Sequence, residues 1–231
     1  MGGLTRAVLL DALGTLLELE APGPGLQQSL AARGIDVSAA EAEHAMAAEI
    51  AYYRAHLMMG ADDGGLWALR RRCAEVLADA LPERAGRALA PEEVEAALLD
   101  ALRFAPFAEV PGALAALRAA GARLVAVSNW DRSLHDVLAA TGLRPLLDGV
   151  VTSAEAGTAK PDPAIFAHAL AIAGAPASSA LHVGDSLAED VAGARAAGIE
   201  AVLLRREGDP PPGAADVPLI HSLDELLVRA A

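Results

Sequence analysis

The sequence has little cysteine, few aromatic residues and no long apolar segment, and each shortage excludes a class of protein. Cys73 is the only cysteine, which rules out an internal disulfide and favours a reducing, cytoplasmic setting. Aromatic residues make up 3% of the 231 residues, too few for the base-stacking platforms of nucleic-acid-binding proteins. No apolar run approaches the roughly 20 residues of a membrane-spanning helix, and the apolar stretch near the N-terminus is too short for a signal peptide.

Basic residues are also scarce. The chain has 18 lysines and arginines against 31 aspartates and glutamates, a formal net charge of -13. This negative field argues against nucleic acid or an anionic membrane as the main partner. An anionic substrate would need a metal ion or a local cation to offset the field. The length allows one large domain, or a core with an insertion.

Short apolar runs alternate with helical patterns over much of the chain, which predicts an α/β fold with a doubly wound parallel sheet. Residues 7–10 read AVLL, typical of a strand buried on both faces, and Asp11 follows directly. Further strands are expected at 123–127, 149–152, 181–184 and 201–204. Helices are expected at 111–120, up to 138, at 163–174, at 189–197, and finally up to about Arg229.

Residues 18–105 have no convincing strand pattern, and helical spacing recurs instead. Met46, Ile50 and Tyr53 lie on one face of a predicted helix, and Pro91 occupies a typical first helical position. We therefore expect an all-helical insertion over residues 17–105 that caps the edge of the first strand. The α/β core domain would then consist of residues 1–16 and 106–231.

Four polar groups come directly after predicted strands or in the loops that follow them. They are Asp11 with Thr15, Ser128 with Asn129, Lys160, and Asp185 with Asp190. Each group alone could be an ordinary turn or helix cap. Because the carboxyl ends of parallel strands meet at one edge of a sheet, we expect the four groups to converge there. A carboxylate at such an edge can act as a nucleophile or as a metal ligand.

The same four segments resemble the four motifs of the haloacid dehalogenase-like (HAD) hydrolase superfamily. They read DALGTL at Asp11, SNWD at Ser128, AKPDP at Lys160 and HVGDSLAED at Asp185. The resemblance covers nearly the whole chain, with residues 17–105 in the place of a helical C1-type cap. Within the superfamily the chain looks most like a phosphatase-like branch of largely unassigned substrate that includes the DREG-type group.

The resemblance implies a phosphatase that hydrolyses a small phosphorylated substrate. Asp11 would attack the phosphorus and form an aspartyl phosphate, which water then hydrolyses. Thr15, Ser128 and Asn129 would bind the phosphoryl group. Lys160 would neutralise charge on the nucleophile and on the transferring group.

The resemblance also implies a Mg²⁺ cofactor. Asp11, Asp185 and the backbone carbonyl of Leu13 would be ligands of the ion, which prefers oxygen donors. Asp190 would complete the metal site or would act one step away, by orienting a water molecule or Lys160. The oligomeric state remains open between a monomer and a homodimer.

Leu13 departs from the superfamily pattern. Most HAD phosphatases carry an aspartate two positions after the nucleophile, where it protonates the leaving alcohol and later activates water. A leucine can do neither, and such acid-base help is worth about 10² to 10⁴ in rate. Alkyl phosphates should therefore turn over slowly, whereas aryl and acyl phosphates should suffer least. Asp131 and His135 are open as substitutes, and we interpret His182 as a core histidine.

Leu13 also keeps other functions under consideration. The superfamily's 2-haloacid dehalogenases have a nonacidic residue at this position, but they lack an acidic metal ligand where Asp185 stands. Phosphonatases need a cap lysine for a Schiff base, and residues 17–105 contain no lysine, which excludes them. The dehalogenase therefore stays as the weaker alternative, and the stronger one is a binding or regulatory protein that keeps the fold and has lost efficient catalysis.

Overall fold

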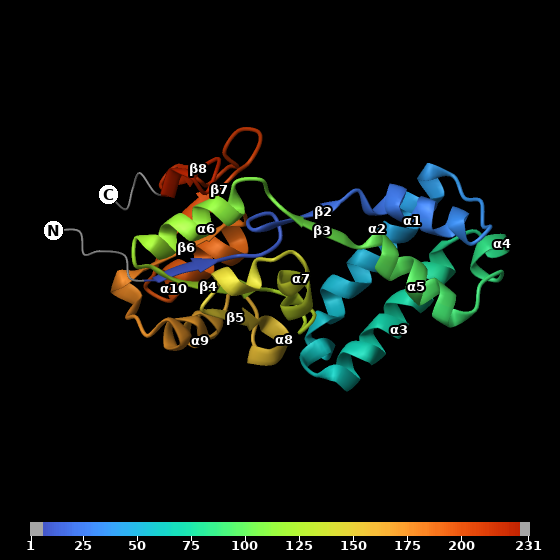
Figure 1. Ribbon diagram of the computed structural model, residues 1–231, viewed down its shortest axis with the longest axis horizontal. Helices are drawn as coiled ribbons and strands as arrows, with labels where there is room; N and C mark the ends of the chain where they lie inside the picture. Colours follow the sequence, from blue (N-terminus) through green and yellow to red (C-terminus); the bar gives the residue numbers. More distant parts are fainter. Residues whose placement is uncertain (1–6, 227–231) are drawn as a thin grey trace. The chain divides into compact units, whose positions relative to one another are not determined.

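The computed structural model describes residues 7–226, which form two compact units (Figure 1). The core unit comprises residues 7–18 and 106–226, and the helical unit comprises Leu19–Ala105. The end of the last expected helix, near Arg229, lies outside the described residues. Among residues 7–226, no helix has both the length and the apolar character that crossing a membrane requires.

The core unit is built on a six-stranded parallel sheet with the order β5-β4-β1-β6-β7-β8. Its strands are β1 (Ala7–Leu10), β4 (Arg123–Ser128), β5 (Gly149–Thr152), β6 (Ala180–Gly184), β7 (Glu200–Leu204) and β8 (Leu219–Ile220). This architecture confirms the predicted doubly wound α/β fold. Strand β1 lies between β4 and β6, with Leu9 paired to Val125 and His182, so it is buried on both faces and both edges.

Helices cover both faces of this sheet. They are α6 (Val110–Ala119), α7 (Leu134–Ala140), α8 (Ser153–Ala156), α9 (Pro163–Ala173) and α10 (Ala192–Ala196), with short turns η2 (Arg144–Leu146) and η3 (Ala177–Ser179). Phe166 of α9 and Ala194 of α10 pack with Leu9 in one apolar cluster. Helix α6 contacts β4 and lies across the sheet from α9 (Figure 1).

The segment before α10 differs from its predicted form. We expected a regular helix over 189–197, whereas Leu187–Val191 (η4) is a π-helical turn and α10 begins only at Ala192. The carbonyl of Ser186 accepts from the N–H groups of both Asp190 and Val191, which widens the turn. Such turns are frequent at functional sites, and this one carries Asp190.

The helical unit has an apolar core of its own. Its helices are α1 (Pro22–Ala32), α2 (Ala39–His56), η1 (Leu57–Ala61), α3 (Asp63–Ala80), α4 (Glu83–Gly86) and α5 (Pro91–Ala101). Ser38 and Glu41 form a capping box at the start of α2, and the side chain of Asp62 caps α3. Met46, Leu69 and Leu98, from three of these helices, are buried together.

The expectation of no strand between 18 and 105 is wrong at both ends of this span. Strands β2 (Leu17–Glu20) and β3 (Arg103–Pro106) pair as a two-stranded sheet where the chain leaves and re-enters the core unit. Each strand has only four residues, and its partner is far away in the sequence. A local pattern therefore carried no signal for this pairing.

Candidate functional site

Three strand ends at the centre of the sheet bring polar residues together in the core unit. Asp11 follows β1, Ser128 ends β4 and Asp185 follows β6, which are adjacent parallel strands. The N–H group of Asp11 donates to the carbonyl of Val183 at 2.9 Å, which continues the pairing of β1 with β6. The hydroxyl of Ser128 donates to Asp11 Oδ1 at 3.1 Å. The predicted convergence of these residues on one sheet edge is therefore present.

Lys160, the only lysine of the sequence, joins this group from the loop before α9. Its Nζ lies 2.5 Å from Asp11 Oδ1 and 2.6 Å from Asp190 Oδ1. The side chain is 1% exposed, so the ammonium is nearly sealed from water. A buried ammonium needs charge-assisted hydrogen bonds, and the two carboxylates provide them.

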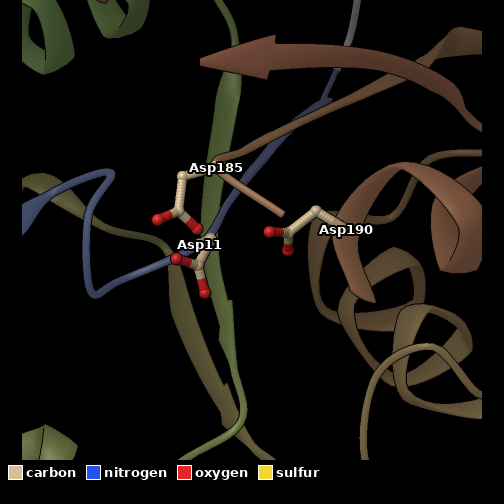
Figure 2. Close-up of side chains that lie close together, drawn as sticks. All are labelled: Asp11, Asp185 and Asp190. Atoms are coloured by element: carbon tan, nitrogen blue, oxygen red, sulfur yellow. The ribbon is translucent and has the colours of Figure 1, made fainter. Parts of the chain in front are cut away.

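Asp11, Asp185 and Asp190 form a carboxylate cluster (Figure 2). One oxygen from each residue lies within 4.8 Å of the others. Asp11 and Asp190 are buried, whereas Asp185 is exposed. Three carboxylates at this separation repel one another unless cations balance them, and oxygen donors of this kind suit a hard divalent ion.

Two glycines make the cluster possible. A Cβ atom on Gly14 would lie 2.2 Å from Asp185 Oδ2, and Gly14 also has a φ of 84°, which side chains rarely adopt. A Cβ atom on Gly184 would lie 2.2 Å from the carboxyl carbon of Asp190. Both carboxylates therefore occupy space that any other residue at these glycines would fill.

The acids of the cluster have strongly perturbed pKa values. Although Asp185 reaches the surface, its carboxylate is partly shielded from water, and this desolvation raises its pKa to about 6; the charges of Asp11 and Asp190 add to the rise. Burial also raises the pKa of Asp11, against the opposing effect of Lys160. For Asp190 burial is outweighed by Lys160 and His182, which hold its pKa far below the usual range. For Lys160 the carboxylates outweigh burial and raise its pKa.

His182, a residue of β6, contacts Asp190 of the cluster. This contact was not predicted from the sequence. Its Nε2 lies 2.9 Å from Asp190 Oδ1, and its ring packs edge-on against Phe166. The ring is fully buried, as expected for a core histidine, but Asp190 gives it a polar partner. Residues two apart on a strand share a face, so an acid packed on Gly184 comes within reach of His182. The alternation of side-chain faces along β6 was therefore the sequence signal that could have predicted the contact between His182 and Asp190.

Asn129 holds the loop of Lys160 in place. Its Oδ1 accepts from the N–H group of Lys160 at 2.7 Å, and its Nδ2 donates to the carbonyl of Lys160 at 3.0 Å. The same Nδ2 donates to Glu189 at 2.9 Å. The predicted phosphoryl-binding amide is thus engaged in positioning the lysine.

Thr15 and Leu13 lie in the loop between β1 and β2. Thr15 is fully buried, and its hydroxyl has no hydrogen-bond partner among the residues described. A buried hydroxyl without a partner is costly, and a bound oxyanion would satisfy it. Leu13 is half-buried and forms a backbone bridge with Leu17.

The two substitutes considered for the missing acid have partners of their own. Asp131 is buried, and its Oδ1 accepts from the N–H group of Ser133 at 2.7 Å. The Nε2 of His135 lies 2.9 Å from Glu155, a residue of α8. Both side chains therefore serve local contacts around α7 and α8.

Comparisons with known proteins agree with this geometry. A family model for haloacid dehalogenase-like hydrolases matches residues 5–198. The haloacid dehalogenase-like hydrolase domain-containing protein 3 of Danio rerio is 41% identical over 126 residues, which cover 53% of this chain. The chain spans about half the length of the curated relatives that it matches, 52% in this case.

Two solved structures are similar over nearly the full length. A HAD phosphatase from Thermococcus onnurineus is 28% identical with a TM-score of 0.65, covering 96% of this chain and 95% of that one. A 2-haloacid dehalogenase from Pseudomonas syringae is also 28% identical, with a TM-score of 0.66, covering 98% and 99%. Similarity of fold therefore does not distinguish the two reactions. The match to the family model over most of the sequence establishes the family, though not the reaction. The chain belongs to the haloacid dehalogenase-like hydrolase family.

Proposed function

We propose that this hydrolase is a Mg²⁺-dependent phosphatase that acts through an aspartyl phosphate on Asp11. The carboxylate cluster beside the buried ammonium of Lys160 is the observation that carries the proposal. Transfer of a phosphoryl group requires positive charge around the nucleophile and the phosphoryl oxygens. Lys160 supplies one such charge, and a divalent ion in the cluster would supply the other.

The residues of the cluster fit a magnesium ion. Asp11, Asp185 and Asp190 offer carboxylate oxygens, and the family motif adds the backbone carbonyl of Leu13 as a ligand. Desolvation and the charges of Asp11 and Asp190 together raise the pKa of Asp185, and a metal ion bound there would offset both effects. Bound there, Mg²⁺ would neutralise the phosphoryl oxygens, and it would favour the ionised form of Asp11 that attacks.

In the proposed reaction, a carboxylate oxygen of Asp11 bonds to phosphorus while the bond from phosphorus to the leaving oxygen breaks. The leaving oxygen takes the electron pair. Water then attacks the phosphorus of the aspartyl phosphate, which releases inorganic phosphate and restores the Asp11 carboxylate. The hydroxyls of Thr15 and Ser128 would donate to phosphoryl oxygens, and Lys160, positioned by Asn129, would balance the charge on Asp11.

The proposed substrates are phosphate esters and acyl phosphates with leaving groups of low pKa. Leu13 leaves the position of the usual acid without a proton donor, and Asp131 and His135 are engaged in their own contacts. A leaving group that is stable as an anion needs no proton. We further infer that the helical unit is a C1-type cap that selects the substrate. We also place the chain in the phosphatase-like branch that includes the DREG-type group.

Two other functions compete with this proposal. A dehalogenase would act on an anionic haloacid without a metal, and the charge of Asp185, which has no direct cationic partner in the cluster, would repel that substrate from Asp11. A binding or regulatory protein would keep the same fold without turnover, and Leu13 is the observation that favours it.

Turnover of a substrate panel separates these functions. We expect hydrolysis of p-nitrophenyl phosphate and acetyl phosphate with Mg²⁺, and a loss of about 10³-fold or more in Asp11→Asn, which lacks the nucleophile. Asp209→Asn, an exposed site in the 207–215 loop, is the matched control and should keep full activity.

Metal-independent release of chloride from 2-chloropropionate would instead identify a dehalogenase. A folded protein with no turnover of any compound would support the binding protein.

Leu13→Asp should restore a general acid. We expect its rate on alkyl phosphates to rise by about 10², the lower end of the usual gain from acid-base catalysis, with little change on aryl phosphates. Leu13→Asn has a similar size but no acidic proton, and it should show no gain. The measurement is kcat/KM against the pKa of the leaving group. Equal wild-type rates on aryl and alkyl phosphates would mean that another residue already donates the proton.

Asp185→Asn should stabilise the metal-free protein at pH 7.5 and abolish its response to Mg²⁺. Because folding raises the pKa of Asp185 to about 6, its contribution to stability is complete below the unfolded value, near 3.8, and is lost as pH rises through 6. The variant should therefore melt above the wild type at pH 7.5 and equal to it near pH 4, with Asp209→Asn as the control. Mg²⁺ should raise the wild-type Tm more at pH 7.5 than at pH 5. A Tm increase with Mg²⁺ in Asp185→Asn would contradict the metal site.

A further inference from the structure

Arg206, two residues beyond β7, is held by a dense set of contacts within the core unit. Its Nε and Nη2 donate to the carbonyls of Gly14 and Thr15, at 3.2 and 2.6 Å. Its Nη1 pairs with Glu109 at 2.7 Å, and its guanidinium carbon lies 3.3 Å from the centroid of the Phe107 ring. Each of the three guanidinium nitrogens donates a hydrogen bond while the flat face of the group packs on a ring, a combination that an ammonium cannot reproduce.

These contacts are too enclosed to be an ordinary surface ion pair. The side chains of Arg206 and Glu109 are 20% and 19% exposed, so water screens their charges only in part. The neighbouring Arg205 is exposed and has the same charge. Arg205 and Arg206 therefore have the same side chain and charge, and they differ only in burial and contacts.

The loop that Arg206 holds carries part of the proposed active site. It runs from Ala12 to Leu17, directly after Asp11. Its own hydrogen bonds, from the N–H of Gly14 to Leu17 and from the N–H of Leu17 to Ala12, close the loop on itself. Arg206 adds bonds that fix the loop to the end of β7.

The carboxylate cluster contacts the same loop at Gly14. The Cα of Gly14 abuts the carboxylate of Asp185, so closely that a Cβ atom would lie 2.2 Å from its Oδ2. Gly14 is thus held at its carbonyl by Arg206 while its Cα touches a proposed metal ligand. A loop that moved away would change the room available to Asp185.

The second segment that Arg206 holds is the return of the chain into the core unit. Phe107 follows β3, Glu109 precedes α6, and the N–H of Phe107 donates to the carbonyl of Leu16 at 3.3 Å. Arg206 therefore ties together the two places where the chain leaves and re-enters the core unit.

We propose that Arg206 is a positioning residue for the carboxylate cluster, acting through the carbonyls of Gly14 and Thr15. It keeps the loop of residues 12–17 against Asp185, so that the carboxylates have the spacing that a divalent ion requires. This inference rests on the proposed function only in that the cluster binds such an ion.

Hydrogen exchange and metal affinity together test this role. In metal-free Arg206→Ala we expect the amides of Gly14 and Leu17 to exchange faster, and the concentration of Mg²⁺ at half-saturation to rise about tenfold, as for other residues that orient metal ligands. Arg205→Ala removes the same charge and should match the wild type in both measurements. Arg206→Lys should be intermediate. Glu109→Gln keeps the arginine, and it serves as the second variant if Arg206→Ala does not fold.

Exchange in Arg206→Ala equal to that in Arg205→Ala would overturn the proposal. Faster exchange with unchanged Mg²⁺ affinity would also overturn it, because the contacts would then be structural alone. A wild-type protein that binds no Mg²⁺ would refute the metal site of the proposed function. The exchange comparison would still decide whether Arg206 holds the loop.

Discussion

The ammonium of Lys160 lies between the carboxylates of Asp11 and Asp190, at 2.5 and 2.6 Å, and the arrangement of the site depends on it. Each acid is buried, and without the lysine their charges would be uncompensated in a medium of low dielectric constant. Removing one partner of such a buried group typically costs about 3 to 5 kcal/mol. Asn129 fixes the lysine through both polar groups of its backbone, and His182 fixes Asp190 from the sheet side. The ammonium and its supports come from four separate parts of the chain.

The one positive charge of Lys160 does not balance three carboxylates. The excess negative charge lowers the stability of the fold, so its presence points to a role in function. Asp185 is the acid without a direct cationic partner in the cluster, and its pKa is raised first by the loss of water around its carboxylate and then by the charges of Asp11 and Asp190. A chain selected for stability alone would have a neutral residue there. The close approach of Gly14 and Gly184 to these acids shows that the backbone is shaped around the cluster. Such local cost is typical of sites whose geometry serves chemistry.

The sequence predicted the parallel sheet, and with it the edge where Asp11, Ser128 and Asp185 meet, because apolar runs ending in polar residues are local patterns. It did not predict contacts between distant segments that lie away from these strand ends. The pairing of β2 with β3 and the bonds from Arg206 to the loop before β2 join residues far apart in the chain, and no periodicity records them. The π-helical turn at Leu187–Val191 was missed because its residues also suit an ordinary helix.

The state of Lys160 is the most direct test of this account, and the sequence makes the test clean because it contains no other lysine. Protein labelled with ¹³C-lysine should give a single Cε resonance, followed by NMR from pH 7 to 10.5. If Asp11 and Asp190 hold the ammonium as described, the shift should stay at its charged value throughout, and Asp190→Asn should lower the pKa. Half-titration near the ordinary lysine pKa of about 10.4, unchanged by Asp190→Asn, would contradict the shared ammonium on which the site is built.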